Sequence, residues 1–183
     1  MNLILPILMG ITLSSCASKP PARDLPTVAR VDVPKYMGKW HEIARLDMFF
    51  QKGCVDSTAE YALQPGGTVS VVNRCLKDGK PKSVRGTATV VDPQTNAILE
   101  VRFNEWFSAF IPRAKEGNYF IIWLAPDYSA AAVGTPNRKY LWLLSRTPTV
   151  SPARYKTMTD YCRSLGFPVD KLLVEEGAVA THR

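Results

Sequence analysis

The side chains that most often perform catalysis are scarce in this sequence. Its 183 residues include only two histidines, His41 and His182. His41-Glu42 begins like the zinc-protease motif His-Glu-x-x-His, whose two histidines bind the metal from one face of a helix. Arg45 stands where the second histidine would have to be, and His182 lies far away in the sequence. The sequence therefore predicts no metal site around His41.

Motifs for a catalytic nucleophile or a phosphate-binding loop are missing as well. The chain has no Gly-x-Ser-x-Gly elbow and no phosphate-binding glycine loop. A lipase or isomerase that uses carboxylates such as Glu60 is the remaining catalytic alternative, but Glu60 is explained more simply as a strand residue facing water. We expect a binding protein rather than an enzyme, with neither a cofactor nor a metal ion.

Two of the four cysteines flank a predicted hairpin. Cys54 and Cys75 enclose two alternating segments joined by Gln64-Pro65-Gly66-Gly67, a pattern typical of a β-hairpin. Folding such a hairpin brings its two ends together, so we predict a Cys54–Cys75 disulfide. A bond between Cys162 and Cys54 is the alternative. If Cys16 is modified as described next, the odd number that remains leaves one thiol free.

The first sixteen residues resemble an export signal that ends at a lipid-modified cysteine. The apolar run from Leu3 to Leu13 is shorter than the about 20 residues that a membrane-spanning helix needs. Leu13-Ser14-Ser15-Cys16 resembles the lipobox of bacterial lipoproteins, in which the cysteine is acylated and starts the mature chain. An ordinary signal peptide with an incidental cysteine, or a misplaced start codon, is the alternative.

The lipobox resemblance implies a location. Residues 1–15 would be the signal peptide, and Cys16 would anchor the protein. Ala17 follows the cysteine, where lipoproteins kept at the inner membrane usually carry Asp, so the resemblance implies the bacterial outer membrane, facing the periplasm. The proline-rich composition of residues 16–30 predicts an extended stalk, and residues 31–183 are long enough to form one domain.

The charge of the chain does not indicate a nucleic-acid partner. Its 23 basic and 16 acidic residues give a formal net charge of +7. Binding of nucleic acid would require basic residues clustered on one element with aromatic residues between them, whereas here they are dispersed. We therefore expect a solvated basic surface, with proximity to anionic phospholipid as the second interpretation.

The domain is predicted to consist of short strands separated by turn residues. The eight candidate strands are residues 38–46, 55–63, 68–75, 83–91, 97–103, 118–124, 129–134 and 140–145. A helix is expected from Ser151-Pro152 to Gly166, with Cys162 on its apolar face as a buried free thiol, followed by a last apolar segment, 172–174. Eight antiparallel strands either stack as a sandwich or close into a barrel that holds a small ligand.

The pattern of inward positions indicates a cation at one end of the sheet. Trp142, Leu144 and Arg146 share one side of their strand. A buried cation must be paired or stacked, and Trp40, near the start of the first strand, could supply the aromatic face.

Three segments in order resemble the signatures of the lipocalin family. They are YMGKWHEIARLDMFFQKGC through Gly38 and Trp40, APDYSAAAVGTP through Asp127 and Tyr128, and KYLWLLSRTPTVS through Arg146. The likeness covers nearly all of the domain and is strongest to bacterial lipocalin lipoproteins related to apolipoprotein D. It implies an all-β fold, an eight-stranded antiparallel up-and-down β-barrel with one C-terminal α-helix packed on the outside. Trp40 and Arg146 would then plug its closed end.

The resemblance also implies a lipid ligand, either a fatty acid, a lysophospholipid or a similar amphiphile, stored or transported for membrane maintenance under stress. The predicted ligand-binding residues, chosen by strand parity, are Leu99, Val101, Phe103, Tyr119, Ile121, Trp123 and Trp142. The alternative is that these side chains only fill a packed barrel. The aromatic segment from Trp106 to Ile111 is interpreted as a rim for lipid or membrane. The alternatives are that it folds back as a lid, or that it is a surface for a partner or a homodimer.

Overall fold

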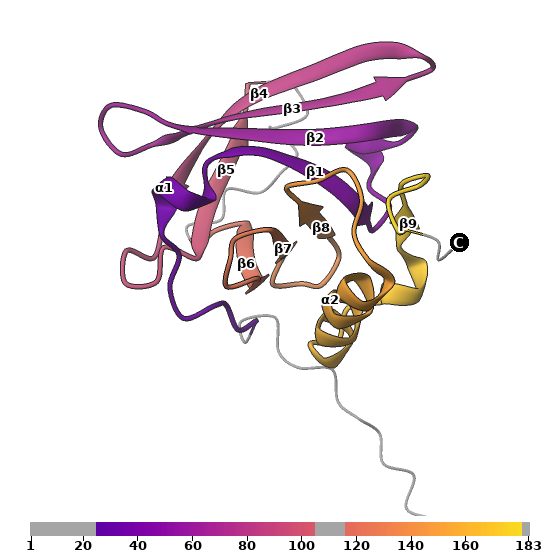
Figure 1. The fold of residues 1–183 in the computed structure, drawn as a ribbon. Helices are drawn as coiled ribbons and strands as arrows, with labels where there is room; N and C mark the ends of the chain where they lie inside the picture. Colours follow the sequence, from indigo (N-terminus) through magenta and orange to yellow (C-terminus); the bar gives the residue numbers. More distant parts are fainter. Residues whose placement is uncertain (1–24, 105–115, 181–183) are drawn as a thin grey trace, which may run out of the picture.

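The computed structural model describes residues 25–104 and 116–180 (Figure 1). The predicted signal peptide, Cys16 and the segment from Trp106 to Ile111 lie outside the described residues. Eight antiparallel strands form one sheet: β1 (Gly38–Arg45), β2 (Cys54–Leu63), β3 (Val69–Lys77), β4 (Lys80–Val90), β5 (Ile98–Phe103), β6 (Tyr119–Leu124), β7 (Ala130–Gly134) and β8 (Leu141–Ser145).

The sheet closes on itself through its first strand. Each strand from β2 to β7 pairs with the next one in sequence, and β1 pairs with both β8 and β2. At the closure, His41 lies opposite Thr58 on one side and Ser145 on the other. Closure gives each of the eight strands a partner on both sides over at least part of its length. The predicted up-and-down barrel is therefore confirmed, and so are its eight strands.

Short elements extend the barrel at both ends. Helix α1 (Val33–Tyr36) precedes β1, and the single turn η1 (Phe49–Gln51) follows it. After β8 come helix α2 (Pro152–Ser164), the turn η3 (Val169–Lys171) and the short strand β9 (Leu173–Val174), which pairs with β1. As predicted, α2 begins at the cap residue Ser151, whose Oγ accepts a hydrogen bond from the Arg154 amide at 3.2 Å.

The hairpin between β3 and β4 is longer than the sequence indicated. Asp78 and Gly79 form its two-residue turn with φ of +52° and +69°, a conformation that suits the twist of paired strands. Pro81, which the sequence analysis placed in a loop, lies in β4 opposite Leu76. Because β5 pairs with β4 only from Gly86 onward, β4 is an edge at Pro81, where a missing amide is tolerated.

Residues 25–30, which were assigned to the stalk, lie against the barrel. Leu25 is buried in the cluster below α2, and the Val28 amide donates to the Ile121 carbonyl at 3.0 Å. The packed part of the chain therefore begins before the expected boundary at residue 31.

Two hydrophobic clusters lie on opposite faces of the sheet. The inner cluster lies inside the barrel and includes Trp40, Tyr61, Val71, Leu99, Ile121 and Leu144. The outer cluster joins strands to α2 and includes Ile43, Phe120, Ile122, Leu143, Met158 and Cys162. Helix α2 thus covers one side of the barrel, away from β3 and β4 (Figure 1).

The closed end is organised around Trp40 and Arg146. Trp40 is fully buried, and its indole N–H donates to the Tyr36 carbonyl at 2.9 Å. The Arg146 guanidinium lies 3.8 Å from the centre of the Trp40 ring and donates to the carbonyls of Lys35, Tyr36 and Lys39. Stacking and hydrogen bonds together offset the cost of partly burying the cation.

The other signature residues hold the turns around this end. Gly38 has φ of +93°, and a Cβ there would lie 3.4 Å from Arg146 Nη1, so glycine suits both the backbone and the approach. Tyr128 accepts a hydrogen bond from the Asp32 amide at 2.9 Å, and the Asp127 carboxylate accepts from the amide and hydroxyl of Ser129.

The cysteines are arranged as predicted. Cys54 and Cys75 form a disulfide across β2 and β3, and Cys162 of α2 is free and buried in the outer cluster. Burial raises the pKa of the Cys162 thiol to about 12.

We expect Trp40→Ala to reduce the free energy of unfolding by roughly 3–5 kcal/mol, because it leaves a large cavity beneath Arg146. Denaturant unfolding followed by circular dichroism measures this loss. Leu63→Ala, which removes an exposed side chain near the same end, is the control and should change stability by less than about 0.5 kcal/mol. Equal losses in the two variants would contradict the structural role of Trp40.

Cys162 should be inert in the folded protein. Near neutral pH its raised pKa leaves almost no thiolate, and its burial excludes the reagent. For a chain covering residues 17–183, which lacks Cys16, mass spectrometry should detect no alkylation by iodoacetamide until denaturant is added, and then one labelled thiol. Labelling of the native protein at the rate of a free thiol would show that the site is open.

Candidate functional site

Six of the seven predicted ligand-binding residues belong to the inner cluster. They come from β5, β6 and β8: Leu99, Val101, Phe103, Tyr119, Ile121 and Trp142. Alternation along each strand places these side chains on the inner face of the barrel while their neighbours face outward. Small side chains such as Ala88 and Ala131 also line this face. The inner face of the barrel is therefore mainly apolar.

The prediction that Trp123 faces the lumen is wrong. The register between β6 and β7 shifts between Ile121 and Trp123, so the alternation reverses after Ile121. Trp123 packs against the outer cluster, and the Arg154 guanidinium of α2 lies 5.6 Å from its ring centre. Leu124 takes the next inward position.

Three tyrosine hydroxyls meet inside the barrel. They belong to Tyr36, Tyr61 and Tyr119. The hydroxyl oxygen of Tyr119 lies 2.9 Å from that of Tyr36 and 3.0 Å from that of Tyr61. Burial raises the pKa of all three phenols, that of Tyr61 to about 12, so they remain protonated near neutral pH. Two hydrogen bonds among three hydroxyls leave one proton without an acceptor in the described part of the chain.

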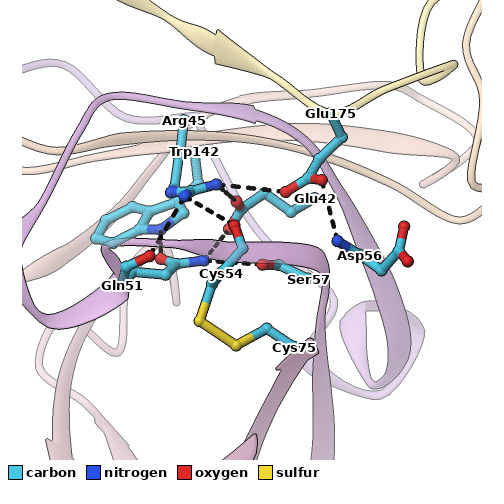
Figure 2. A network of polar contacts seen from close by, with 9 residues as sticks. All are labelled: Glu42, Arg45, Gln51, Cys54, Asp56, Ser57, Cys75, Trp142 and Glu175. Carbon is cyan, nitrogen blue, oxygen red and sulfur yellow. Dashed lines mark hydrogen bonds and ion pairs between the residues drawn. A yellow bond between two sulfur atoms is a disulfide. The ribbon is translucent and has the colours of Figure 1, made fainter. Parts of the chain in front are cut away.

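A buried charged network lies at the other end of β1 (Figure 2). Arg45 Nη1 is 2.9 Å from Glu42 Oε1 and 3.3 Å from Glu175 Oε1. Arg45 Nη2 donates to the carbonyls of Gln51 and Cys54 at 3.3 and 3.1 Å. A buried ion pair is tolerated only when further hydrogen bonds of this kind satisfy it.

Gln51 joins this network to the barrel wall. Its side-chain amide donates to Glu42 Oε2 at 2.8 Å and to Ser57 Oγ at 3.2 Å. Its Oε1 accepts from the Trp142 indole N–H at 3.4 Å. The turn η1 is thus fixed to the inner face at three points, and Figure 2 shows Gln51 next to both Trp142 and Ser57.

The electrostatics of the network are set by burial. Burial raises the pKa of Glu42, and the facing Arg45 cation and the Gln51 hydrogen bond oppose that rise. Two buried polar atoms, Arg45 Nε and Asn73 Oδ1, have no hydrogen-bond partner among the described residues. Asn73 has the same strand parity as Val69 and Val71 of the inner cluster.

Sequence analysis missed both polar groups. Glu42 and Arg45 were considered only for the absent zinc motif, and Tyr36 and Tyr61 were not singled out. The available signal was the inward parity of Glu42 with Trp40 on a strand that is otherwise buried.

This arrangement is suited to binding a molecule that is mostly apolar with polar ends. The inner face of the barrel offers apolar side chains, hydroxyl donors at the tyrosines and charged groups at the Arg45 end. Among residues 25–104 and 116–180, no three His, Cys, Asp or Glu side chains are grouped so that they could hold a metal ion. Within the same residues, no helix has the length and apolar character needed to cross a bilayer.

Comparison with known proteins agrees with this geometry. The profile of the lipocalin-like domain family matches residues 31–176. Temperature-induced lipocalin-1 of Arabidopsis thaliana is 36% identical over 153 residues, which cover 82% of this chain and 81% of the relative. The outer membrane lipoprotein Blc of Vibrio cholerae is 35% identical over 176 residues, covering 94% and 97%. Bovine apolipoprotein D is 30% identical over 161 residues, covering 82% and 79%.

A solved structure supports the same fold at lower identity. Insecticyanin from the tobacco hornworm Manduca sexta superposes with a TM-score of 0.60 at 15% identity, covering 85% of this chain and 87% of that one. With the closed barrel, the Trp40–Arg146 plug and the profile match over most of its length, this chain belongs to the lipocalin family.

Proposed function

We propose that this protein binds an amphiphilic lipid, a fatty acid, lysophospholipid or similar molecule, inside the barrel and does not catalyse its conversion. The observation that carries the proposal is the division of the inner face into an apolar wall and polar groups near the Arg45 end. A hydrocarbon tail fits the first, and a polar head fits the second.

The energetics favour long hydrocarbon tails in general rather than one specific chain length. Each methylene group transferred from water into the lumen stabilises the complex by about 0.8 kcal/mol. An additional methylene therefore changes affinity only modestly, and we expect several chain lengths to bind. Leu99, Val101 and Ile121 provide the contacts for such a tail.

The polar groups favour a head that accepts hydrogen bonds. The Nε–H of Arg45 has no partner among the described residues and can donate to a carboxylate or phosphate oxygen. The unpaired hydroxyl proton of the Tyr36, Tyr61 and Tyr119 group can serve an acceptor deeper in the barrel.

The proposed location is the periplasmic side of a bacterial outer membrane, with an anchor at Cys16. Two observations support it, the lipobox ending at Cys16 and the similarity to proteins named outer membrane lipoprotein Blc in Vibrio cholerae and Escherichia coli. In that setting the protein would store or carry lipids for maintenance of the membrane.

Trp142→Ala should weaken lipid binding by about tenfold, the equivalent of about 1.4 kcal/mol, while the fold is retained. The substitution removes an inner aromatic surface and the donor to Gln51. Titration of the delipidated chain 17–183, which retains every described residue, with a fluorescent fatty acid measures the affinity, and natural lipids should displace the probe.

Trp123→Ala is the matched control, because this second tryptophan lies outside the barrel and its loss should leave probe affinity unchanged. Unfolding midpoints of both variants exclude a general loss of structure. The proposal fails if the delipidated protein neither binds such probes nor copurifies with any lipid.

Mass spectrometry of the intact protein from its native membrane should report acylation at Cys16 and the loss of residues 1–15. Cys16→Ser should abolish the acyl mass and release the protein from the membrane fraction. An unmodified cysteine in the mature protein would contradict the anchor without affecting the proposed lipid site.

A further inference from the structure

Three tyrosine side chains meet at the closed end of the barrel. Tyr36 belongs to α1, Tyr61 to β2 and Tyr119 to β6. The ring centre of Tyr36 lies 5.0 Å from that of Trp40 and 5.9 Å from that of Tyr61. The ring centres of Tyr61 and Tyr119 are 6.1 Å apart. The three tyrosines therefore lie next to the Trp40 plug, at the α1 end of the barrel and away from the Arg45 end (Figure 1).

The side chains around the three hydroxyls are apolar. In the paired strands Tyr61 lies opposite Val71, and Tyr119 lies opposite Leu99. Val71 and Leu99 are buried in the inner cluster together with Tyr61, and Tyr119 packs against that cluster. Phenylalanine would fill the same space with the same ring, so packing alone does not explain the hydroxyl groups. A buried hydroxyl is favourable only where it forms hydrogen bonds.

The hydroxyls satisfy one another only in part. The hydrogen bonds from Tyr119 to Tyr36 and to Tyr61, 2.9 and 3.0 Å long, join α1, β2 and β6 and use two of the three protons. In any orientation of the hydroxyls, one proton has no acceptor among the described residues, and several oxygen lone pairs stay free. Burial raises the pKa of all three phenols, so this spare proton is retained near neutral pH. The group can therefore bind one further group that both accepts and donates a hydrogen bond.

One side of the tyrosine group is open to a ligand. Tyr36 is 4% exposed and Tyr61 is 7% exposed, whereas Tyr119 is only partly buried. Phe103 and Leu124, which pack against the same inner cluster, are also only partly buried. The inner face is thus not closely packed throughout, and a molecule inside the barrel can reach the group from the Tyr119 side.

We propose that the tyrosine group, defined as Tyr36, Tyr61 and Tyr119, binds a hydroxyl group carried at or near the far end of the hydrocarbon chain of the ligand. This inference rests on the proposed function, in which the polar head of the lipid lies near Arg45. The ligand class is then a fatty acid that is hydroxylated away from its carboxyl group. The ligand oxygen accepts the spare phenol proton and returns its own proton to a phenol oxygen, so that all four hydroxyls are paired.

Other chain ends fit this position less well. A ketone or ether oxygen accepts the spare proton but has no proton to return. A second carboxylate would place a charge among apolar side chains, and the nearby Arg146 cation already donates to backbone carbonyls. A plain methyl end leaves the phenol proton without a partner. The tyrosine group should therefore distinguish a hydroxylated chain end from a plain one.

The first test compares a series of saturated fatty acids, from octanoic to hexadecanoic acid, with the same acids that carry a hydroxyl on the last carbon. Each acid displaces a fluorescent fatty acid from the delipidated chain 17–183, which gives its affinity. Moving a hydroxyl from water to an apolar wall weakens binding. For at least one chain length we expect no such weakening, so that the hydroxylated acid binds at least as tightly as the plain one.

The second test removes the hydroxyls from the protein. Tyr36→Phe, Tyr61→Phe and Tyr119→Phe combined keep the three rings and leave no hydroxyl of the group unpaired, so the unfolding midpoint should stay close to that of the parent. This triple variant should bind the plain acids as the parent does. It should bind the best terminal hydroxy acid about tenfold more weakly than the parent does.

Two controls accompany the triple variant. An acid hydroxylated next to its carboxyl group should bind the parent and the triple variant equally. Tyr161→Phe removes a phenol hydroxyl from α2, outside the barrel, and should leave every affinity unchanged. The first test uses the parent chain alone and decides the question if the triple variant does not fold.

The outcomes separate this inference from the proposed function. Weaker binding of the hydroxylated acid at every chain length overturns the inference, since water alone would then satisfy the spare proton. An equal loss of plain and hydroxylated acids in a folded triple variant also overturns it, because the carboxyl head would then lie at the tyrosines. Both results keep the proposed lipid binding. A parent chain that binds neither kind of acid refutes the proposed function, and this inference with it.

Discussion

The barrel depends on the way in which one cation, Arg146, is accommodated at its closed end. The Trp40 ring lies against the guanidinium, and the backbone carbonyls of Lys35, Tyr36, Lys39 and Tyr128 accept its N–H groups. Three of those carbonyls belong to α1 and to the start of β1, so the side chain that directly follows β8 fixes the segment that closes the barrel. Without this contact the end of the barrel at Trp40 would not be closed. The register of β1 between β2 and β8 would also be less constrained.

Strand β1 contributes residues both to the closed end of the barrel and to the charged network at the other end. β1 presents Trp40 at the plug and Glu42 and Arg45 further along, with a register shift between Glu42 and Ala44. This bulge turns Ile43 and Ala44 towards α2 and returns Arg45 to the inner face opposite Trp142. A local irregularity therefore allows one strand to serve the outer core, the plug and the charged network.

Much of the fold could be predicted because its signals are local. Strand alternation, turn residues and the Ser151-Pro152 helix start each depend on a few neighbouring residues, and the hairpin brings Cys54 and Cys75 together. The position of Trp123 could not be predicted. A one-residue bulge is not visible in the alternation of apolar and polar residues along the sequence, yet it moves every later side chain of the strand to the opposite face. The Glu42–Arg45 network was missed because its partners, such as Glu175, come from distant segments. The packing of Leu25 on the barrel was likewise hidden by the prolines around it.

The contribution of Glu175 to the network has a consequence for the order of assembly. Arg45 and Glu175 are separated by 130 residues in the chain, and β9 reaches β1 only after every other strand has been laid down. Contacts between residues so far apart in sequence form late in folding. The chain loses the entropy of closing the long loop between the two residues before their contact stabilises the fold. The Arg45 end of the barrel is therefore the last part to be completed during folding, when β9 pairs with β1 and brings Glu175 to Arg45.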